Sequence, residues 1–243
     1  MIGGWNNSGD TLGEYQFNSQ VVINGVEKKS STFSIAREYN FGFVPQIVET
    51  DSLPFLILHH PRKLHPTSQT PPDSTQIKLI YYLNNFVEFN PKHVKHHKIQ
   101  KIEFASGSSE TQPVFQMILN DKNESWFRAS INNFVKGSEY NGSFKTHIIK
   151  ADFQELCELL NYVDFENIPS YGIASGYPAE AIKIIYDDGK VKEIYTYDWS
   201  KTYGLQAVFN KIEQLRLSQN WLHSNKSIKI TLHKPEQRLK WKA

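Results

Sequence analysis

The sequence has almost no cysteine and no long apolar run. A single cysteine, Cys157, stands among 243 residues, so no disulfide within the chain can hold the fold. No apolar stretch approaches the roughly 20 residues of a membrane-spanning helix. The chain also does not open with a basic segment followed by an apolar one, as a signal peptide would. These absences predict a globular, cytoplasmic protein, or an exported one from which a signal has been removed.

Common catalytic and cofactor-binding motifs are missing as well. The sequence has no Gly-x-Ser-x-Gly, no Walker-type or dinucleotide-binding glycine loop and no His-Glu-x-x-His. In the segment 172–176 the serine stands one residue too late for a nucleophile elbow, and the paired carboxylates Asp187 and Asp188 lie in an expected turn. We therefore expect no cofactor and no catalytic residue, and the sequence leans against an enzyme.

The composition predicts a packed protein that is rich in strands. Hydrophobic residues make up 39% of the chain and charged residues 21%, a mixture that supports a core. Aromatic residues reach 13%, and their rings favour the pleated surface of a sheet. The net charge of +2 gives no overall field that would steer an anionic partner to the chain.

The first 90 residues carry mainly strand patterns. The run 21–26 leads through Asn24-Gly25, a strong hairpin signal because both residues tolerate positive φ. Further strands are expected over 33–35, 55–58 and 77–89. Four prolines between residues 61 and 74 predict a loop there.

Two amphipathic helices are expected in the second half. The first has apolar residues at helical spacing and opens at Asp152–Glu155, which matches a capping box. Its stripe is Phe153, Leu156, Cys157, Leu160 and Val163, which predicts that Cys157 is a buried, inert thiol. The second helix is expected from Leu205 to Trp221.

Strands that alternate with these helices complete the second half. Antiparallel strands are expected over 102–104, 115–119, 126–131 and 143–149. The turn Asp187–Lys190 lies between two further alternating runs and indicates a hairpin. One last strand is expected over 227–232.

Together these patterns predict an α+β protein of largely antiparallel sheets, with two helices packed on the sheet in its C-terminal half. We expect a mainly β region over 1–90, an α+β domain over 98–233 and a basic tail over 234–243. The boundary near residues 90–98 could equally be a crossover within one continuous sheet.

A series of short phrases runs in order through residues 98–221. They are Ile102-Glu103-Phe104, Gly142-Ser143-Phe144, Asp152-Phe153, Tyr171, Ala181-Ile182-Lys183-Ile184, Asp188-Gly189-Lys190 and Gly204-Leu205. This order resembles an uncharacterised bacterial domain-of-unknown-function family that is often seen in exported proteins. The resemblance implies a sheet with two packed helices, and it carries no assigned activity and no catalytic residue.

The N-terminus resembles a second family. Ile2-Gly3-Gly4-Trp5, followed by Tyr15-Gln16-Phe17, is similar to the opening of lipocalin-like β-barrels, in which Gly-x-Trp begins the first strand. The resemblance implies that the N-terminal half carries a small apolar ligand. The alternative is a tryptophan that covers the edge of an ordinary sheet.

Histidines and lysines form two further groups that could bind ligands. His93, His96 and His97 lie close together, as do His59, His60 and His65, and imidazole is a common metal ligand. However, Lys92, Lys95 and Lys98 surround the first group and oppose a cation, so we expect a solvated basic connector and no metal site.

The basic segments 92–101 and 226–242 could contact phosphates, with Trp241 stacking on a base. No nucleic-acid-binding motif accompanies them, so we expect solvated surface there and no nucleic-acid partner.

Aromatic residues supply the best candidate binding patch. Four rings fall between Tyr195 and Tyr203, and rings with polar tips are typical both of recognition surfaces and of wet core edges. The predicted patch comprises Tyr171, Tyr177, Tyr197, Trp199 and Tyr203. On this reading the protein is a non-enzymatic binding or structural module, and the alternative is the lipocalin-like carrier of a small apolar ligand.

Overall fold

The computed structural model describes residues 2–5, 15–23, 26–35, 44–48, 55–59, 76–91, 96–107, 113–129, 141–168, 170, 179–197, 202–226 and 232. Within these ranges the chain forms sheets of three, four and seven strands. Neighbouring strands in all three sheets are antiparallel. Two α-helices lie in the C-terminal half, so the predicted α+β class is confirmed.

The chain divides into two compact units. The first unit comprises residues 1–92 and 199–207, and the second comprises 93–198 and 208–243. Helix α2 (Tyr203–Ser218) contributes its first turn to the first unit and the rest of its length to the second. Whether the two halves fold as separate domains stays a prediction.

The first unit contains the three-stranded and four-stranded sheets. In the order β1-β2-β3, the smaller sheet joins β1 (Ile2–Trp5), β2 (Tyr15–Ile23) and β3 (Val26–Ile35). Ile23 pairs with Val26, which confirms the hairpin predicted around the Asn-Gly pair. The larger sheet runs in the order β4 (Val44–Val48), β5 (Phe55–His59), β6 (Gln76–Tyr82) and β7 (Asn85–Glu88).

Both faces of the four-stranded sheet carry buried side chains. The neighbours Leu79 and Ile80 point to opposite faces of β6, and they are 0% and 5% exposed. On the face of Ile80, the Nζ atom of Lys78 lies 3.6 Å from the ring centre of Phe55 and 4.7 Å from that of Phe89. The ammonium group therefore stacks on two rings that also contact each other edge to face.

The second unit is built on the seven-stranded sheet, whose order is β13-β12-β8-β9-β10-β11-β14. Its strands are β8 (Ile99–Gly107), β9 (Pro113–Asn120), β10 (Ser125–Ala129), β11 (Gly142–Thr146), β12 (Ala179–Tyr186), β13 (Lys190–Tyr197) and β14 (Leu222–His223). The short edge strand β14 was not predicted. The strand expected over 227–232 lies outside the described residues, apart from position 232.

Two adjacent rows of paired residues cross this sheet and separate its faces. The first row is apolar and at most 5% exposed on six strands, and on β14 it ends at the exposed His223. Its six buried members are Ile194, Ile182, Phe104, Met117, Phe127 and Phe144. The second row lies one residue along each strand: Glu193, Lys183, Glu103, Ile118, Trp126, Lys145 and Leu222. Because side chains alternate along a strand, the two rows point to opposite faces.

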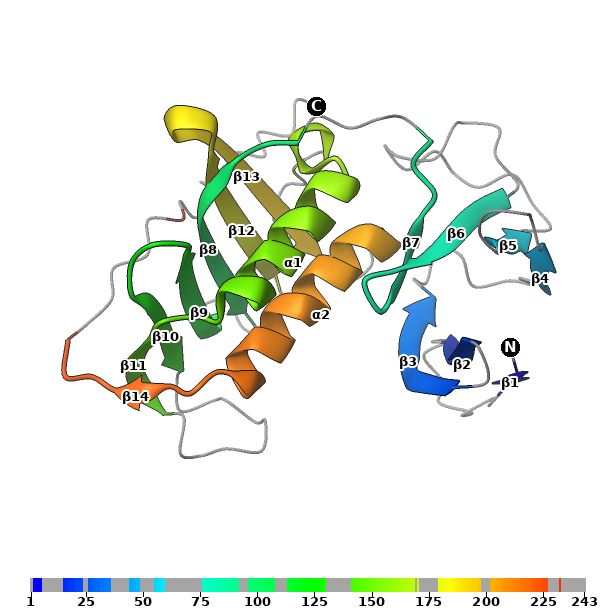
Figure 1. Cartoon of the computed structure of the whole chain (residues 1–243), viewed down its shortest axis with the longest axis horizontal. Coiled ribbons are helices and arrows are strands. Elements are labelled where there is room, and N and C mark those ends of the chain that lie inside the picture. The colour runs from blue at the N-terminus through cyan, green and yellow to red at the C-terminus, as the bar shows by residue number, and fades with distance from the viewer. Residues whose placement is uncertain are drawn as a thin grey trace, which may run out of the picture. The chain divides into compact units, whose positions relative to one another are not determined.

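Helices α1 (Lys150–Tyr162) and α2 lie side by side on the apolar face of the sheet (Figure 1). Phe209 of α2 packs on Phe104, with ring centres 5.4 Å apart, and the ammonium group of Lys211 pairs with Glu155 of α1. This arrangement confirms that both predicted amphipathic helices pack on the sheet. In the predicted stripe of α1, Phe153, Leu156 and Leu160 are buried, whereas Cys157 and Val163 are only partly buried.

The start of α1 differs from the predicted capping box. The helix begins at Lys150, and its N-cap residue Ile149 makes no side-chain capping bond. Instead, the backbone N–H of Ile149 donates to Oε1 of Gln219 at 2.9 Å, and Nε2 of Gln219 donates to Asp152 at 2.7 Å. Gln219, just beyond α2, thus accepts the N-cap N–H, the role that a capping box gives to its glutamate.

The end of α2 buries a charged side chain. Arg216 is 0% exposed, and its guanidinium carbon lies 4.9 Å from the ring centre of Phe115. Its Nε donates to Glu213 at 2.8 Å, and its Nη2 also pairs with that carboxylate. The helix ends at Ser218, before the expected Trp221, whose indole N–H donates to the carbonyl of Arg216 at 2.9 Å.

No helix in the described part of the chain is long and apolar enough to cross a membrane.

Candidate functional site

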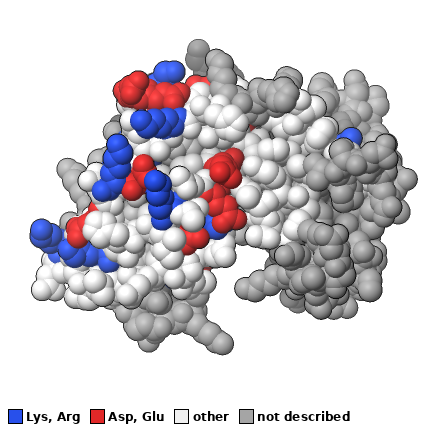
Figure 2. All heavy atoms as spheres, viewed as in Figure 1, with Lys and Arg blue, Asp and Glu red and all other residues white. Residues whose placement is uncertain are grey.

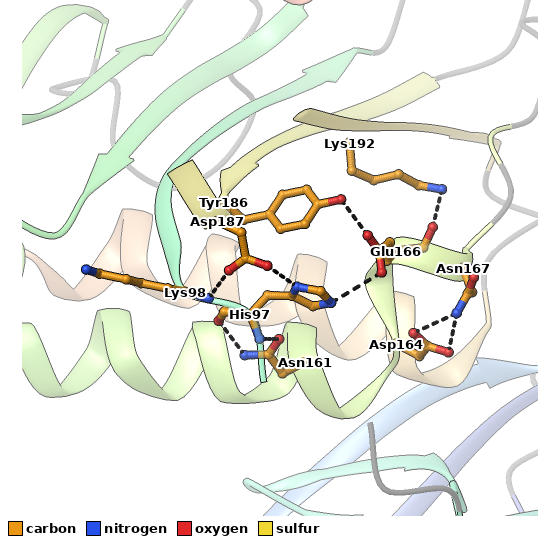
Figure 3. A network of polar contacts seen from close by, with 9 residues as sticks. All are labelled: His97, Lys98, Asn161, Asp164, Glu166, Asn167, Tyr186, Asp187 and Lys192. Carbon is orange, nitrogen blue, oxygen red and sulfur yellow. Dashed lines mark hydrogen bonds and ion pairs between the residues drawn. The ribbon is translucent and has the colours of Figure 1, made fainter. Parts of the chain in front are cut away.

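A histidine of the second unit lies where three parts of the chain that are distant in sequence meet (Figure 3). His97 lies just before β8, and Asn161 lies in the last turn of α1. Glu166 comes from the 3-10 helix η3 (Phe165–Asn167), and Asp187 opens the turn η4 (Asp187–Gly189) between β12 and β13. We call His97, Asn161, Glu166, Tyr186 and Asp187 the histidine cluster.

Backbone hydrogen bonds hold the segment 97–98 in place. Asn161 accepts the N–H of His97 at 3.0 Å, and its own amide donates to the carbonyl of His97 at 3.1 Å. Asp187 accepts the N–H of Lys98 at 2.8 Å and donates its backbone N–H to the carbonyl of Lys98 at 3.1 Å. The position of the imidazole is therefore fixed by the backbone on both sides.

Both ring nitrogens of His97 face a carboxylate. Nδ1 lies 2.5 Å from Oδ2 of Asp187, and Nε2 lies 3.3 Å from Oε2 of Glu166. The His97 side chain is 7% exposed. The rings of Phe165 and Tyr186 contact the imidazole edge to face at 5.4 and 5.0 Å between ring centres.

The carboxylates are bound by further groups. The hydroxyl of Tyr186 donates to Oε1 of Glu166 at 2.9 Å, and Nζ of Lys192 donates to the carbonyl of Glu166 at 2.7 Å. The hydrogen bond with His97, followed by the one from the Lys98 N–H, lowers the pKa of Asp187. Burial, followed by the bond to Glu166, raises the pKa of the Tyr186 hydroxyl.

This geometry favours a structural role for the cluster. A catalytic histidine keeps one nitrogen free for a nucleophile or substrate, whereas both nitrogens of His97 are occupied. The two carboxylates also lie at opposite nitrogens of the ring and cannot converge on one ion. In the part of the chain that the structure describes, no group of three histidine, cysteine or acidic side chains could hold a metal.

The predicted histidine groups have different outcomes. His96 is exposed, as expected of a solvated connector. That expectation is wrong for His97, because carboxylates from distant segments surround it. His93, His60 and His65 lie outside the described residues, as does the side chain of His59.

Most of the predicted aromatic patch cannot be placed. Tyr171, Tyr177 and Trp199 lie outside the described residues, and only the backbone of Tyr197 is described, at the end of β13. Tyr203 is buried at the first residue of α2. The patch stays a prediction.

A carboxylate that sequence reasoning missed lies at the start of α2. The backbone N–H groups of Tyr203 and Gly204 each donate to Glu88 at 2.7 Å, so Glu88 caps the helix from β7. Burial raises the pKa of Glu88, and the hydrogen bonds from Gly204 and Tyr203 offset part of that rise. The sequence pattern could not indicate this role of Glu88, because the helix that it caps begins 115 residues later.

The second row of the seven-stranded sheet, which points away from the helices, is most exposed at its β14 end. Glu103 and Ile118, at the middle of the row, are 1% and 8% exposed, whereas Leu222 is 60% exposed. Trp126 is half-buried and Lys145 is paired with Glu124 at 2.6 Å. Arg128 is exposed on the same face as Trp126, two residues along β10. We call Trp126, Arg128, Lys145 and Leu222 the outer patch.

Charges of both signs are interspersed over the helix-bearing side of the second unit. Figure 2 shows lysine and arginine side chains next to acidic ones on the face in view. Such mixing produces no extended field of one sign among the residues described there.

A comparison with protein families found a match in the C-terminal half of the chain. Residues 100–216, which span from β8 into the last turn of α2, match the family model "Domain of unknown function (DUF6438)". The resemblance predicted over residues 98–221 is thereby confirmed as a domain of unknown function, whereas nothing supports the lipocalin-like resemblance. Searches of curated proteins and of solved structures found no match.

Proposed function

We propose that the second unit is a non-enzymatic module that binds a partner through the outward face of its seven-stranded sheet. The outer patch is the observation that carries this proposal. It combines a tryptophan, an arginine and an exposed leucine on one face, and tryptophan and arginine are enriched among the residues that dominate protein interfaces.

The charges of the outer patch favour the same reading. Lys145 is bound to Glu124, and Arg128 makes no ion pair with any residue that the structure describes. An exposed guanidinium with five N–H donors is available to bind a carboxylate or a carbonyl of a partner. Trp126 lies beside it and offers apolar area at little cost in conformational entropy.

The histidine cluster supports a module without catalysis. Its titratable side chains bind one another and so connect the end of α1, η3, the segment before β8 and the β12–β13 turn. These contacts stabilise the packing of the four segments, so the histidine cluster supports the fold.

Photo-crosslinking from two exposed leucines tests the proposal. A photoreactive residue at Leu222, in the outer patch, is compared with the same residue at Leu217 of α2, which is 48% exposed. In cells that produce the full chain, we expect a discrete adduct from position 222 that Arg128→Glu abolishes. The purified partner should then bind Arg128→Glu or Trp126→Ala about tenfold more weakly.

Two results would contradict the proposal. One is equal crosslinking from positions 222 and 217, which would indicate non-specific contact. The other is chemical conversion of the bound molecule by the protein, which would indicate an enzyme.

A further inference from the structure

We infer that His97 is a proton-dependent tie, which bridges Asp187 and Glu166 when both ring nitrogens are protonated and releases Glu166 when one proton is lost. A neutral imidazole has one N–H donor and one bare lone pair. With carboxylate oxygens 2.5 Å from Nδ1 and 3.3 Å from Nε2, the neutral ring would direct its lone pair at a negative charge. Only the imidazolium ring donates in both directions.

The groups around the ring reinforce this preference. Asp187 faces it from the β12–β13 turn and Glu166 from η3, while Asn161 of α1 binds only the backbone of His97. Tyr186 and Phe165 contact it with ring edges.

The nearby lysines bind other atoms. Lys192 donates to the carbonyl of Glu166, Lys98 contributes its backbone N–H to Asp187, and Nζ of Lys190 lies 6.0 Å from the Tyr186 ring centre. Two carboxylates therefore face the imidazole directly, and no ammonium group among the described residues does.

The two contacts differ in how they respond to loss of a proton. Asp187 is the nearer carboxylate, so the remaining proton stays on Nδ1. Glu166 is farther away and keeps the hydroxyl of Tyr186 as a donor, so its carboxylate stays satisfied without His97. Loss of the proton therefore breaks the contact of His97 with Glu166 of η3 and keeps its contact with Asp187 of the β12–β13 turn.

Nitrogen NMR of the full chain tests the inference directly. With ¹⁵N-labelled histidine, long-range spectra distinguish the imidazolium ring from each neutral tautomer. We expect His97 to be imidazolium in acid and, as the pH is raised, to lose the proton on Nε2 while keeping the one on Nδ1, which lies nearer to a carboxylate.

Two matched variants separate this tie from a general charge effect. Glu166→Gln keeps an oxygen acceptor for Tyr186 but removes the charge that faces Nε2, so the imidazolium form should be lost at a lower pH than in the unchanged protein. Asp164→Asn removes a charge beside η3 that binds Asn167 and does not contact His97, so the pH midpoint of His97 should change by much less.

Three results would overturn the inference. They are a neutral His97 across the whole range, first loss of the proton from Nδ1, and a midpoint that Glu166→Gln leaves unchanged.

Discussion

At the scale of single residues, the second unit buries charged side chains next to opposite charges. Arg216 is fully buried beside Glu213, and Lys211 is 7% exposed beside Glu155. Glu103 is 1% exposed and lies 2.6 Å from Nζ of Lys101. Such pairs offset part of the desolvation of each ion, so removal of one partner is more damaging than replacement of both by apolar groups.

Arg216 and Glu213 allow this rule to be tested. Glu213→Ala leaves a buried guanidinium without its counter-charge. We expect it to lower the free energy of unfolding by about 2 kcal/mol, below the usual range because Glu213 is one-third exposed. Arg216→Met removes the buried charge itself, including the buried Nη1 that has no hydrogen-bond partner, and should cost about 1 kcal/mol. Urea unfolding measures both, and the reverse order would contradict the argument.

Asn161 is expected to be a stability determinant. Asn161→Ala leaves the buried N–H and carbonyl of His97 without partners and should destabilise the protein by about 1–3 kcal/mol. Asn167→Ala is the matched control, because Asn167 is exposed and bonds only Asp164. Its effect in the same urea titration should stay within about 0.5 kcal/mol.

Cys157 is expected to be unreactive in the folded protein. Burial raises the pKa of its thiol to about 12, so almost no thiolate is present near pH 8. We expect iodoacetamide to label Cys157 slowly in native protein and rapidly in urea, as followed by mass spectrometry. Fast labelling of the native protein would show that this face of α1 is open.

The histidine cluster could not be predicted from the sequence, although two of its residues had been noticed singly. The sequence drew attention to His97 as one of three neighbouring histidines, and Asp187 was recognised as a turn residue. Nothing in the spacing connects them, because their contact spans 90 residues of chain. Flanking lysines suggested a solvated segment, but tertiary contacts with carboxylates determine the environment of the ring.

At the scale of elements, local signals predicted the hairpins and helices, and distant partners contribute bonds at the start of each helix. Asn-Gly and Asp-Gly pairs specify turns within a few residues, so the β2–β3 and β12–β13 hairpins were predictable. The start of α1 was not, because its N-cap N–H bonds Gln219, which is 70 residues away. The start of α2 combines both kinds of bond: Thr202 accepts the N–H of Leu205 at 3.1 Å as a local cap, and Glu88 of β7 accepts two more N–H groups.

The β12–β13 turn requires glycine for backbone reasons alone. Gly189 has φ of +101°, and a Cβ built there would meet nothing within 4 Å. Gly189→Ala should therefore destabilise the protein by about 1–2 kcal/mol through backbone strain without steric clash. Asp188→Asn, at φ of 62°, should be nearly neutral because asparagine tolerates this region. Thermal denaturation of both variants tests this contrast.

At the scale of the whole molecule, the fold class was predictable from the sequence. The alternation of strands and helices identified the α+β class. The predicted boundary between a β region over 1–90 and an α+β domain over 98–233 stays a prediction, and the two compact units divide the chain within α2. The first turn of α2 groups with the first unit because its N–H groups bond Glu88, a contact that no local pattern encodes.

Two carboxylates should give opposite contributions to stability in acid. The folded pKa of Asp187 lies below its ordinary value of 3.8, so its stabilisation is present above that pH and is lost as pH falls through the folded pKa. The folded pKa of Glu88 lies above its ordinary value of 4.5, so its contribution is present below that pH and is lost as pH rises.

Urea midpoints of two charge-neutral variants measured against pH test these signs. Asp187→Asn should flatten the loss of stability below about pH 4, and Glu88→Gln should flatten the decline above about pH 4.5. Effects of the same sign from both variants would contradict this assignment.

The pleat of the seven-stranded sheet limits the length changes that its strands can accept. If one residue were inserted into β9 between Met117 and Ile118, every later side chain of the strand would point to the opposite face of the sheet. Apolar side chains would then leave the helix-covered face, and polar ones would be placed beneath the helices. Inserting two residues would restore the alternation. Natural insertions within these strands should therefore come in even steps, with odd ones confined to irregularities such as those at Ser106/Gly107 and Ile185/Tyr186.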